Sequence, residues 1–147
     1  MTESPSFQLV DAMRALQAAL DHHDSAVSES QDLGRSDWRC LQALVNKGPL
    51  SPSVLQKRLG LTSGSVTALL DRLERRGLIE RHRDPADRRG LRIVPTQAAG
   101  RMVEAASDPL ESVTSKLLER WGSDRSKAAG QACLDLAKLV EWSARRV

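Results

Sequence analysis

Charged residues on a turn have the most distinctive chemistry in this sequence. Residues 84–90, Asp-Pro-Ala-Asp-Arg-Arg-Gly, are rich in turn formers and lie between the apolar pairs 78–79 and 93–94. Short apolar segments on both sides of such a turn predict an antiparallel hairpin. Guanidinium groups at a hairpin tip suit the narrow, electronegative minor groove of duplex DNA. We expect Asp87 to orient the tip by pairing with an arginine, and the DNA contacts of the hairpin to come from Arg83, Arg88 and Arg89.

Short hydroxyl side chains gather just before this hairpin. Ser51-Pro52 is a helix start and Gly60 a helix stop, and Thr62 is a good cap for a second helix that ends before Gly77. Two helices joined by a three- to four-residue turn form a helix-turn-helix. Small polar groups at the start of its second helix can reach base edges in the major groove, and arginines further along, including Arg76, can reach phosphates. The predicted contacts are Thr62, Ser63, Ser65, Val66, Thr67, Arg72 and Arg75, with Ser51, Ser53 and Lys57 on phosphates.

The charge distribution supports a nucleic-acid partner. The net charge is only +3, but residues 50–95 hold ten Lys/Arg against five Asp/Glu, so the remaining residues are slightly acidic. A positive excess confined to one segment is typical of a phosphate-binding surface. An ordinary solvated surface is the alternative.

Helices are predicted for most of the remaining chain, which gives a mainly α fold. Apolar residues recur at helical spacing over residues 7–28, 36–47 and 125–144. Ser36 is the predicted cap of the second of these helices, and Trp38 is its predicted buried anchor. A further helix begins after Thr96 and is expected to kink or break at Asp108-Pro109.

Composition excludes several other classes. Aromatic residues make up 3% of the chain, which argues against modules that stack single-stranded bases on aromatic rings. The two cysteines are far apart, the sequence shows no evident signal peptide, and no apolar run is long enough to span a membrane. We therefore expect a soluble cytoplasmic protein. Without a nucleophile motif, a phosphate-binding glycine loop or a metal-ligand set, we expect no enzyme activity, no cofactor and no metal.

The hairpin and its flanks resemble the MarR family of winged helix-turn-helix regulators. The resemblance rests on Gly77-Leu-Ile-Glu-Arg81, Asp84-x-x-Asp-Arg-Arg89 and Ile93-x-x-Thr-x-x-x-Gly100, and it extends over almost the whole chain. It implies one MarR-like domain over 1–147, with a DNA-binding region at about 36–95 and dimerisation helices at about 7–34 and 97–146. It also implies a homodimer on a pseudo-palindromic DNA operator, with Arg89 as the minor-groove arginine. Pro95 stands where the family usually has leucine, and Pro109 falls inside its long dimer helix.

The resemblance also implies an effector. MarR-like proteins commonly act as repressors that leave DNA when a small, often aromatic and anionic, molecule binds, and others sense metals or oxidants. Family analogy places the ligand pocket here at Arg14, His22, His23 and Trp38. Two sensor alternatives are a redox-active Cys40 and a metal bound at residues 21–24. Two further alternatives are a non-specific architectural DNA binder and a winged helix that binds protein.

Overall fold

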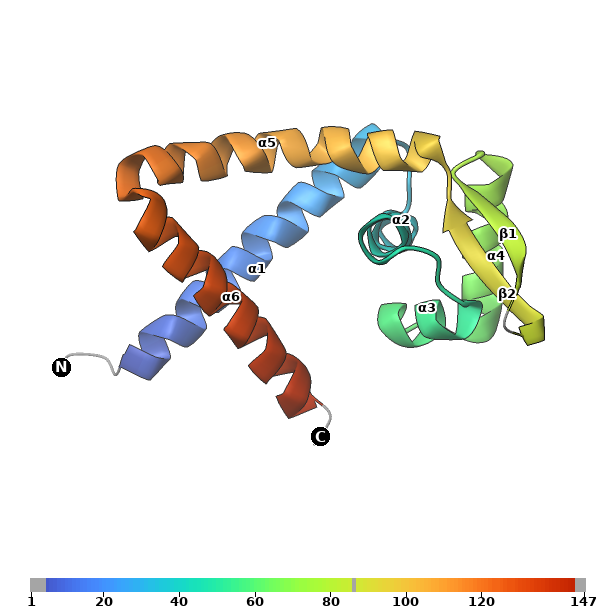
Figure 1. The fold of residues 1–147 in the computed structure, drawn as a ribbon, viewed down its shortest axis with the longest axis horizontal. Coiled ribbons are helices and arrows are strands. Elements are labelled where there is room, and N and C mark those ends of the chain that lie inside the picture. The colour runs from blue at the N-terminus through green and yellow to red at the C-terminus, as the bar shows by residue number, and fades with distance from the viewer. Residues whose placement is uncertain (1–4, 86, 145–147) are drawn as a thin grey trace. The chain divides into compact units, whose positions relative to one another are not determined.

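The protein is mainly α-helical, with one two-stranded hairpin, as the sequence predicts (Figure 1). The computed structural model describes residues 5–85 and 87–144. The chain divides into two compact units, Met1–Ala105 and Ala106–Val147. The elements are α1 (Pro5–Ser30), α2 (Arg35–Lys47), α3 (Pro52–Leu59), α4 (Ser63–Arg75), β1 (Ile79–Asp84), β2 (Asp87–Pro95), α5 (Gln97–Trp121) and α6 (Ser123–Ala144).

Local sequence signals define the helix-turn-helix formed by α3 and α4. The Ser51 hydroxyl accepts a hydrogen bond from the Val54 amide, and a proline occupies the first turn of α3, where its missing N–H costs nothing. Gly60 ends α3 in the left-handed conformation, with φ of 66°. The Thr62 hydroxyl then accepts from the Ser65 amide at the start of α4. These caps confirm the predicted helix-turn-helix.

The hairpin is antiparallel, as predicted, but its turn is tighter than the sequence suggests. Ile79 pairs with Pro95 at one end and Arg83 with Leu91 near the tip, and the register shifts between Arg83 and Asp84. The second strand begins at Asp87, so residues expected in the turn belong to β2. Leu50 exchanges two backbone hydrogen bonds with Ile93, of 3.2 and 2.8 Å, and so joins the α2–α3 connection to the hairpin.

One apolar core holds α2, α3, α4 and the hairpin together. β1 packs on α4, and β2 packs on α2 and α3. Trp38 is buried, as predicted, and its indole N–H donates to Asp24 of α1 at 3.0 Å. The largest fully buried side chains are Trp38, Leu41, Leu44, Leu55, Leu69, Leu73, Ile79 and Ile93.

One local prediction is wrong, and one of two alternatives in another is excluded. Ser36 does not cap α2, because the helix begins one residue earlier with Gly34 in the cap position and no side-chain cap. The chain also does not break at Pro109, which lies within α5. Thr96 does cap α5: its hydroxyl accepts from the Ala99 amide at 3.4 Å and donates to the Gly77 carbonyl at 2.8 Å.

The second unit consists of the end of α5 and α6. Gly122, with φ of 77°, forms the turn between them, and its amide donates to the Leu118 carbonyl. Most large apolar side chains of this unit are exposed. Among the described residues, no helix combines the length and apolar content needed to cross a membrane.

Candidate DNA-binding surface

The start of α4 presents four short hydroxyl side chains, all of them exposed. The Thr62 and Ser65 hydroxyls lie 2.8 Å apart, and the Thr67 hydroxyl donates to the Ser63 carbonyl at 3.0 Å. The predicted contacts Thr62, Ser63, Ser65 and Thr67 therefore share one end of one helix. Hydroxyls can donate and accept, so each retains hydrogen-bonding capacity for an outside partner.

Small residues complete this surface, and the sequence analysis missed them. Gly64 and Ala68 are exposed and lie four residues apart, on the side of α4 opposite the buried stripe. Apart from its chain neighbours and the backbone of its own helix, a Cβ at Gly64 would have no atom of the described residues within 4 Å. Because Gly64 and Ala68 have small side chains, this side of α4 could approach the floor of a DNA groove closely. The spacing of Gly64 and Ala68 relative to the buried residues of α4 could have identified them from the sequence.

Val66 was predicted to contact DNA, and this prediction is wrong. The residue is only 2% exposed, in line with Leu69, Leu70 and Leu73. A side chain buried between helices has no path to DNA. Its position in the helical repeat, three residues before Leu69, already indicated the core.

The arginines at the end of α4 make contacts within the protein. Arg72 donates two hydrogen bonds to the buried carboxylate of Asp37, Nε to Oδ2 at 3.2 Å and Nη2 to Oδ1 at 2.7 Å. Arg76 donates to the Gln31 and Asp32 carbonyls that follow α1. Among the described residues, Arg75 bonds only the Asp71 carbonyl of its own helix, and its side chain is exposed. Of the three, Arg75 is therefore the best placed to meet a phosphate.

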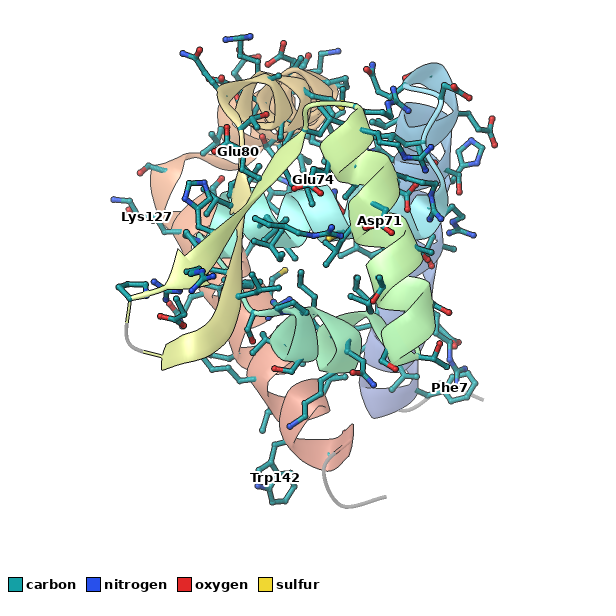
Figure 2. The ribbon with its side chains drawn as sticks, turned by 90° about the vertical axis from the view of Figure 1, so that its right-hand side faces the viewer. Phe7, Asp71, Glu74, Glu80, Lys127 and Trp142 are labelled. Carbon is teal, nitrogen blue, oxygen red and sulfur yellow. The ribbon has the colours of Figure 1, made fainter. Side chains whose placement is uncertain are left out.

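An arginine of the hairpin pairs with the acidic residues of α4. Arg81 Nη2 lies 2.6 Å from Asp71, and its Nη1 lies 3.0 Å from Glu74. Figure 2 shows both acidic residues on α4, beside the hairpin. This pairing fixes the wing against α4. It also offsets two negative charges that would otherwise repel phosphate.

The hairpin tip carries the remaining predicted contacts. Arg83 is exposed, and Arg92 lies 3.7 Å from Asp84. The side chains of Asp87, Arg88 and Arg89 lie outside the part of the chain that the structure describes, so their contacts stay predictions. Their backbone belongs to β2, at the end of the hairpin far from Pro95.

The residues predicted to contact phosphates lie at both ends of α3. Ser51 and Ser53 lie with their hydroxyls 3.0 Å apart, and the Val54 amide donates to Ser51. Lys57 is exposed on the same helix. Ser51 and Ser53 thus lie at the start of α3 and Lys57 in its last turn, and their contacts with phosphate stay predictions.

Comparison with known proteins identifies the family. The MarR family model matches residues 31–90, which extend from the end of α1 to the hairpin. Transcriptional regulator HosA of Escherichia coli O111:H- is 30% identical over 100 residues, 67% of this chain and 73% of HosA. The chain belongs to the MarR family. The uncharacterized HTH-type transcriptional regulator YcgE of Bacillus subtilis is 36% identical over 65% of this chain and 62% of YcgE. The uncharacterized HTH-type transcriptional regulator YkoM of the same organism is 32% identical over 50% of this chain and 47% of YkoM. The match thus spans about half to two thirds of these two relatives.

Solved structures share the whole fold. A MarR family protein from Bacillus stearothermophilus is 25% identical, with a TM-score of 0.73 over 98% of this chain and 99% of that one. A mutant MepR from a multidrug-resistant S. aureus clinical isolate gives a TM-score of 0.75 at 23% identity, over 96% and 98%. The structure of NadR in complex with 4-hydroxyphenylacetate gives a TM-score of 0.64 at 21% sequence identity, over 93% of this chain and 94% of NadR. The winged helix-turn-helix is therefore a MarR fold along nearly all of the chain.

Of the four ligand-pocket residues predicted by analogy with the MarR family, His23 and Trp38 both lie near Asp24 Oδ1, whereas Arg14 and His22 are exposed on α1. Arg14 is exposed and bonds Asp11 of its own helix, and His22 is exposed as well. Trp38 lines a cavity of about 460 Å³ between α1 and α2. That cavity is polar, with Gln17, Asp21, Asp24, Arg35, Ser36 and Arg39 as its other lining residues.

The histidine next to this cavity faces Asp24. His23 Nδ1 lies 3.9 Å from Asp24 Oδ1, and its Nε2 is buried without a hydrogen-bond partner among the described residues. Asp24 also accepts from Trp38 and from Gln42, each at 3.0 Å. Its carboxylate therefore holds α2 against α1. In the described chain, no three His, Cys, Asp or Glu side chains gather in a way that could hold a metal ion.

Cys40 lacks the environment of a redox sensor. It is fully buried on α2, and burial, together with the charge of Asp37, raises the pKa of its thiol to about 12. The reactive form of cysteine is the thiolate, which this environment disfavours. Cys133 is exposed on α6.

Proposed function

We propose that this MarR-family protein is a homodimeric, sequence-specific DNA-binding transcriptional repressor that a small ligand releases from its operator. The observation that carries the proposal is the exposed face of α4. Its first half offers short hydroxyls, Gly64 and Ala68, while the acidic residues of its second half are paired with Arg81. This face suits the major groove, and the neighbouring hairpin suits the minor groove. The relatives named as transcriptional regulators support the same function.

The exposed apolar side chains support a dimer. Monomeric soluble proteins rarely expose many large apolar side chains on one element, because their burial is favourable. In the first unit, α1 exposes Phe7, Leu9, Val10, Leu16 and Leu20; Figure 2 labels Phe7 near the start of that helix. In the second unit, the exposed set is Leu110, Val113, Leu117, Leu118, Trp121, Leu134, Leu139, Val140 and Trp142. A second copy of the chain is the proposed cover for both sets.

An effector is supported by the polar cavity beside Trp38. Arg35 and Arg39 line it and could bind a carboxylate, and the structure of NadR with 4-hydroxyphenylacetate shows that one protein of similar fold takes an aromatic acid. The aspartates of the cavity would favour a ligand that also carries hydrogen-bond donors. We propose a small aromatic acid with a hydroxyl or amino group.

Arg89→Ala tests the proposed DNA binding. If Arg89 enters the minor groove, its loss should weaken operator binding by ~1–3 kcal/mol, roughly 5- to 150-fold. The measurement is equilibrium binding to an operator duplex, selected from random sequences, at several salt concentrations. Sedimentation should show an unchanged oligomer. Adding 4-hydroxyphenylacetate to the wild-type complex tests release in the same assay.

The matched control is Arg101→Ala, which removes an exposed arginine from α5. Its operator affinity should equal that of the wild type. Equal affinities of Arg89→Ala and wild type at matched salt would reject the wing assignment. Equal affinities for operator and random duplex would instead favour an architectural DNA binder, and binding without salt dependence would exclude a phosphate-contacting surface.

A further inference from the structure

Asp37 is an acidic residue in the core of the helix-turn-helix. It lies in the first turn of α2 and is only 5% exposed, next to the buried residues Trp38 and Cys40. A buried carboxylate is costly unless it is paired and hydrogen-bonded. Its presence therefore requires a compensating partner.

That partner is Arg72, which lies 35 residues away on α4. Both carboxylate oxygens accept from the guanidinium, at 2.7 and 3.2 Å, in a two-point contact. This bonding raises the pKa of Arg72 above its already high value. Two parallel hydrogen bonds fix the direction of the side chain as well as its distance.

α2, which carries Asp37, is held in place by contacts on two sides. On one side, Trp38 and Gln42 bond Asp24 of α1, and on the other, Leu41 and Leu44 are fully buried. α4 packs on the core through leucines, whose apolar contacts are non-directional. The paired hydrogen bonds to Asp37 add a directional restraint on the rotation of α4 about its own axis, and theirs is the one with a buried partner.

We propose that Asp37 is a positioning residue for DNA recognition and that it acts through Arg72. The inference rests on the DNA-binding function proposed above and assigns Arg72 to orientation, not to phosphate contact. A rotation of α4 by about 10° would displace atoms about 5 Å from its axis by roughly 1 Å, enough to misplace a recognition group.

The alternative role of Arg72, a phosphate contact, conflicts with its bonding. Its side chain is 47% exposed, but a swing toward DNA would leave Asp37 buried and uncompensated. An exposed contact to one phosphate would stabilise the complex by less than the free energy lost when Asp37 is left buried without its partner. Arg75, which makes no ion pair in the described chain, is free of this conflict.

The experiment compares Asp37→Asn, Arg72→Gln and the double variant Asp37→Leu/Arg72→Met with the wild type. Replacing both partners of an ion pair by apolar residues leaves no buried charge without a partner and is often neutral for stability, so the double variant separates positioning from folding. Each variant should bind the operator about ten-fold more weakly or worse, with an unchanged salt slope. Arg75→Gln is the matched control, whose slope should become less negative by about 1 for each recognition helix.

The proposal is overturned if Asp37→Asn binds as the wild type does, or if a stably folded Asp37→Leu/Arg72→Met does. It is also overturned if Arg72→Gln alone weakens binding and makes the salt slope less negative by about 1 for each recognition helix, as Arg75→Gln does.

Amide hydrogen exchange of the DNA-free protein gives an independent result. Asp37→Asn should speed exchange in α4 and leave α6 unchanged, and equal protection of α4 would also overturn the proposal. If the wild type binds no DNA but α4 loses protection in Asp37→Asn, the DNA-binding function fails while the anchoring of α4 by Asp37 stands.

Discussion

The two halves of α4 differ sharply in how their side chains are used. From Ser63 to Ala68, the exposed side chains are small, and their hydroxyls bond only within their own helix start. From Asp71 to Arg76, the charged side chains other than Arg75 bond α2, the residues that follow α1, and the hairpin. One half is available to a partner, and the other half anchors the helix.

This difference shows how a small helix can be both exposed and rigid. A recognition helix must leave its contact face open, so its position has to be fixed from other sides. Here the fixing contacts come from three directions: Asp37 of α2, the carbonyls after α1, and Arg81 of β1. The charge count of residues 50–95 therefore overstates the positive charge that DNA can meet.

Truncating a buried residue in the anchoring half should have the largest effect. Leu73 is fully buried, so Leu73→Ala should lower the free energy of unfolding by ~2–5 kcal/mol, from lost transfer energy and a residual cavity. Thr67→Ala, a truncation in the open half, should change it by less than about 0.5 kcal/mol. Urea unfolding of both variants measures the difference. Similar losses in the two variants would mean that the halves do not differ as described.

The local features of this fold follow from sequence. Thr62, Pro52 and Gly60 mark the helix ends, and the spacing of Leu69, Leu70 and Leu73 marks the buried face of α4. These signals act over a few residues, so a single sequence contains them. The same spacing would have removed Val66 from the predicted contacts and added Gly64 and Ala68.

The anchoring contacts could not be predicted in this way. Asp37 looks like an ordinary first-turn acid of a helix, where a negative charge is favourable anyway. Its burial, and its pairing with Arg72, depend on how α2 and α4 pack, which no local pattern specifies. Pro109 allowed either a kink or a break from sequence, and the structure excludes the break, because α5 continues through it. Proline removes one hydrogen bond from a helix, and a long helix can tolerate that loss.

Removing hydroxyls from the open half should alter specificity at little cost to stability. Ser63→Ala/Thr67→Ala deletes two exposed groups, so operator affinity should fall by about 1–3 kcal/mol while affinity for random duplex is kept. The salt slope should also be kept, because hydroxyl contacts to bases release no counterions. Competition between operator and random DNA measures the ratio. A uniform loss on both duplexes would show that these hydroxyls contact the backbone instead.

The smallest effect on stability is expected from the exposed contact between the hairpin and the anchoring half of α4. Arg81 is 27% exposed and its partners Asp71 and Glu74 are about half exposed, in contrast to the buried Asp37. Water and salt screen such a pair, so Arg81→Gln should lower the free energy of unfolding by only ~0–1 kcal/mol. Urea unfolding at low salt and at about 1 M salt tests this, since screening should remove the difference from wild type. A loss above about 2 kcal/mol that persists in high salt would mean that Arg81 is held as firmly as Arg72. The wing and the recognition helix would then move as one rigid element.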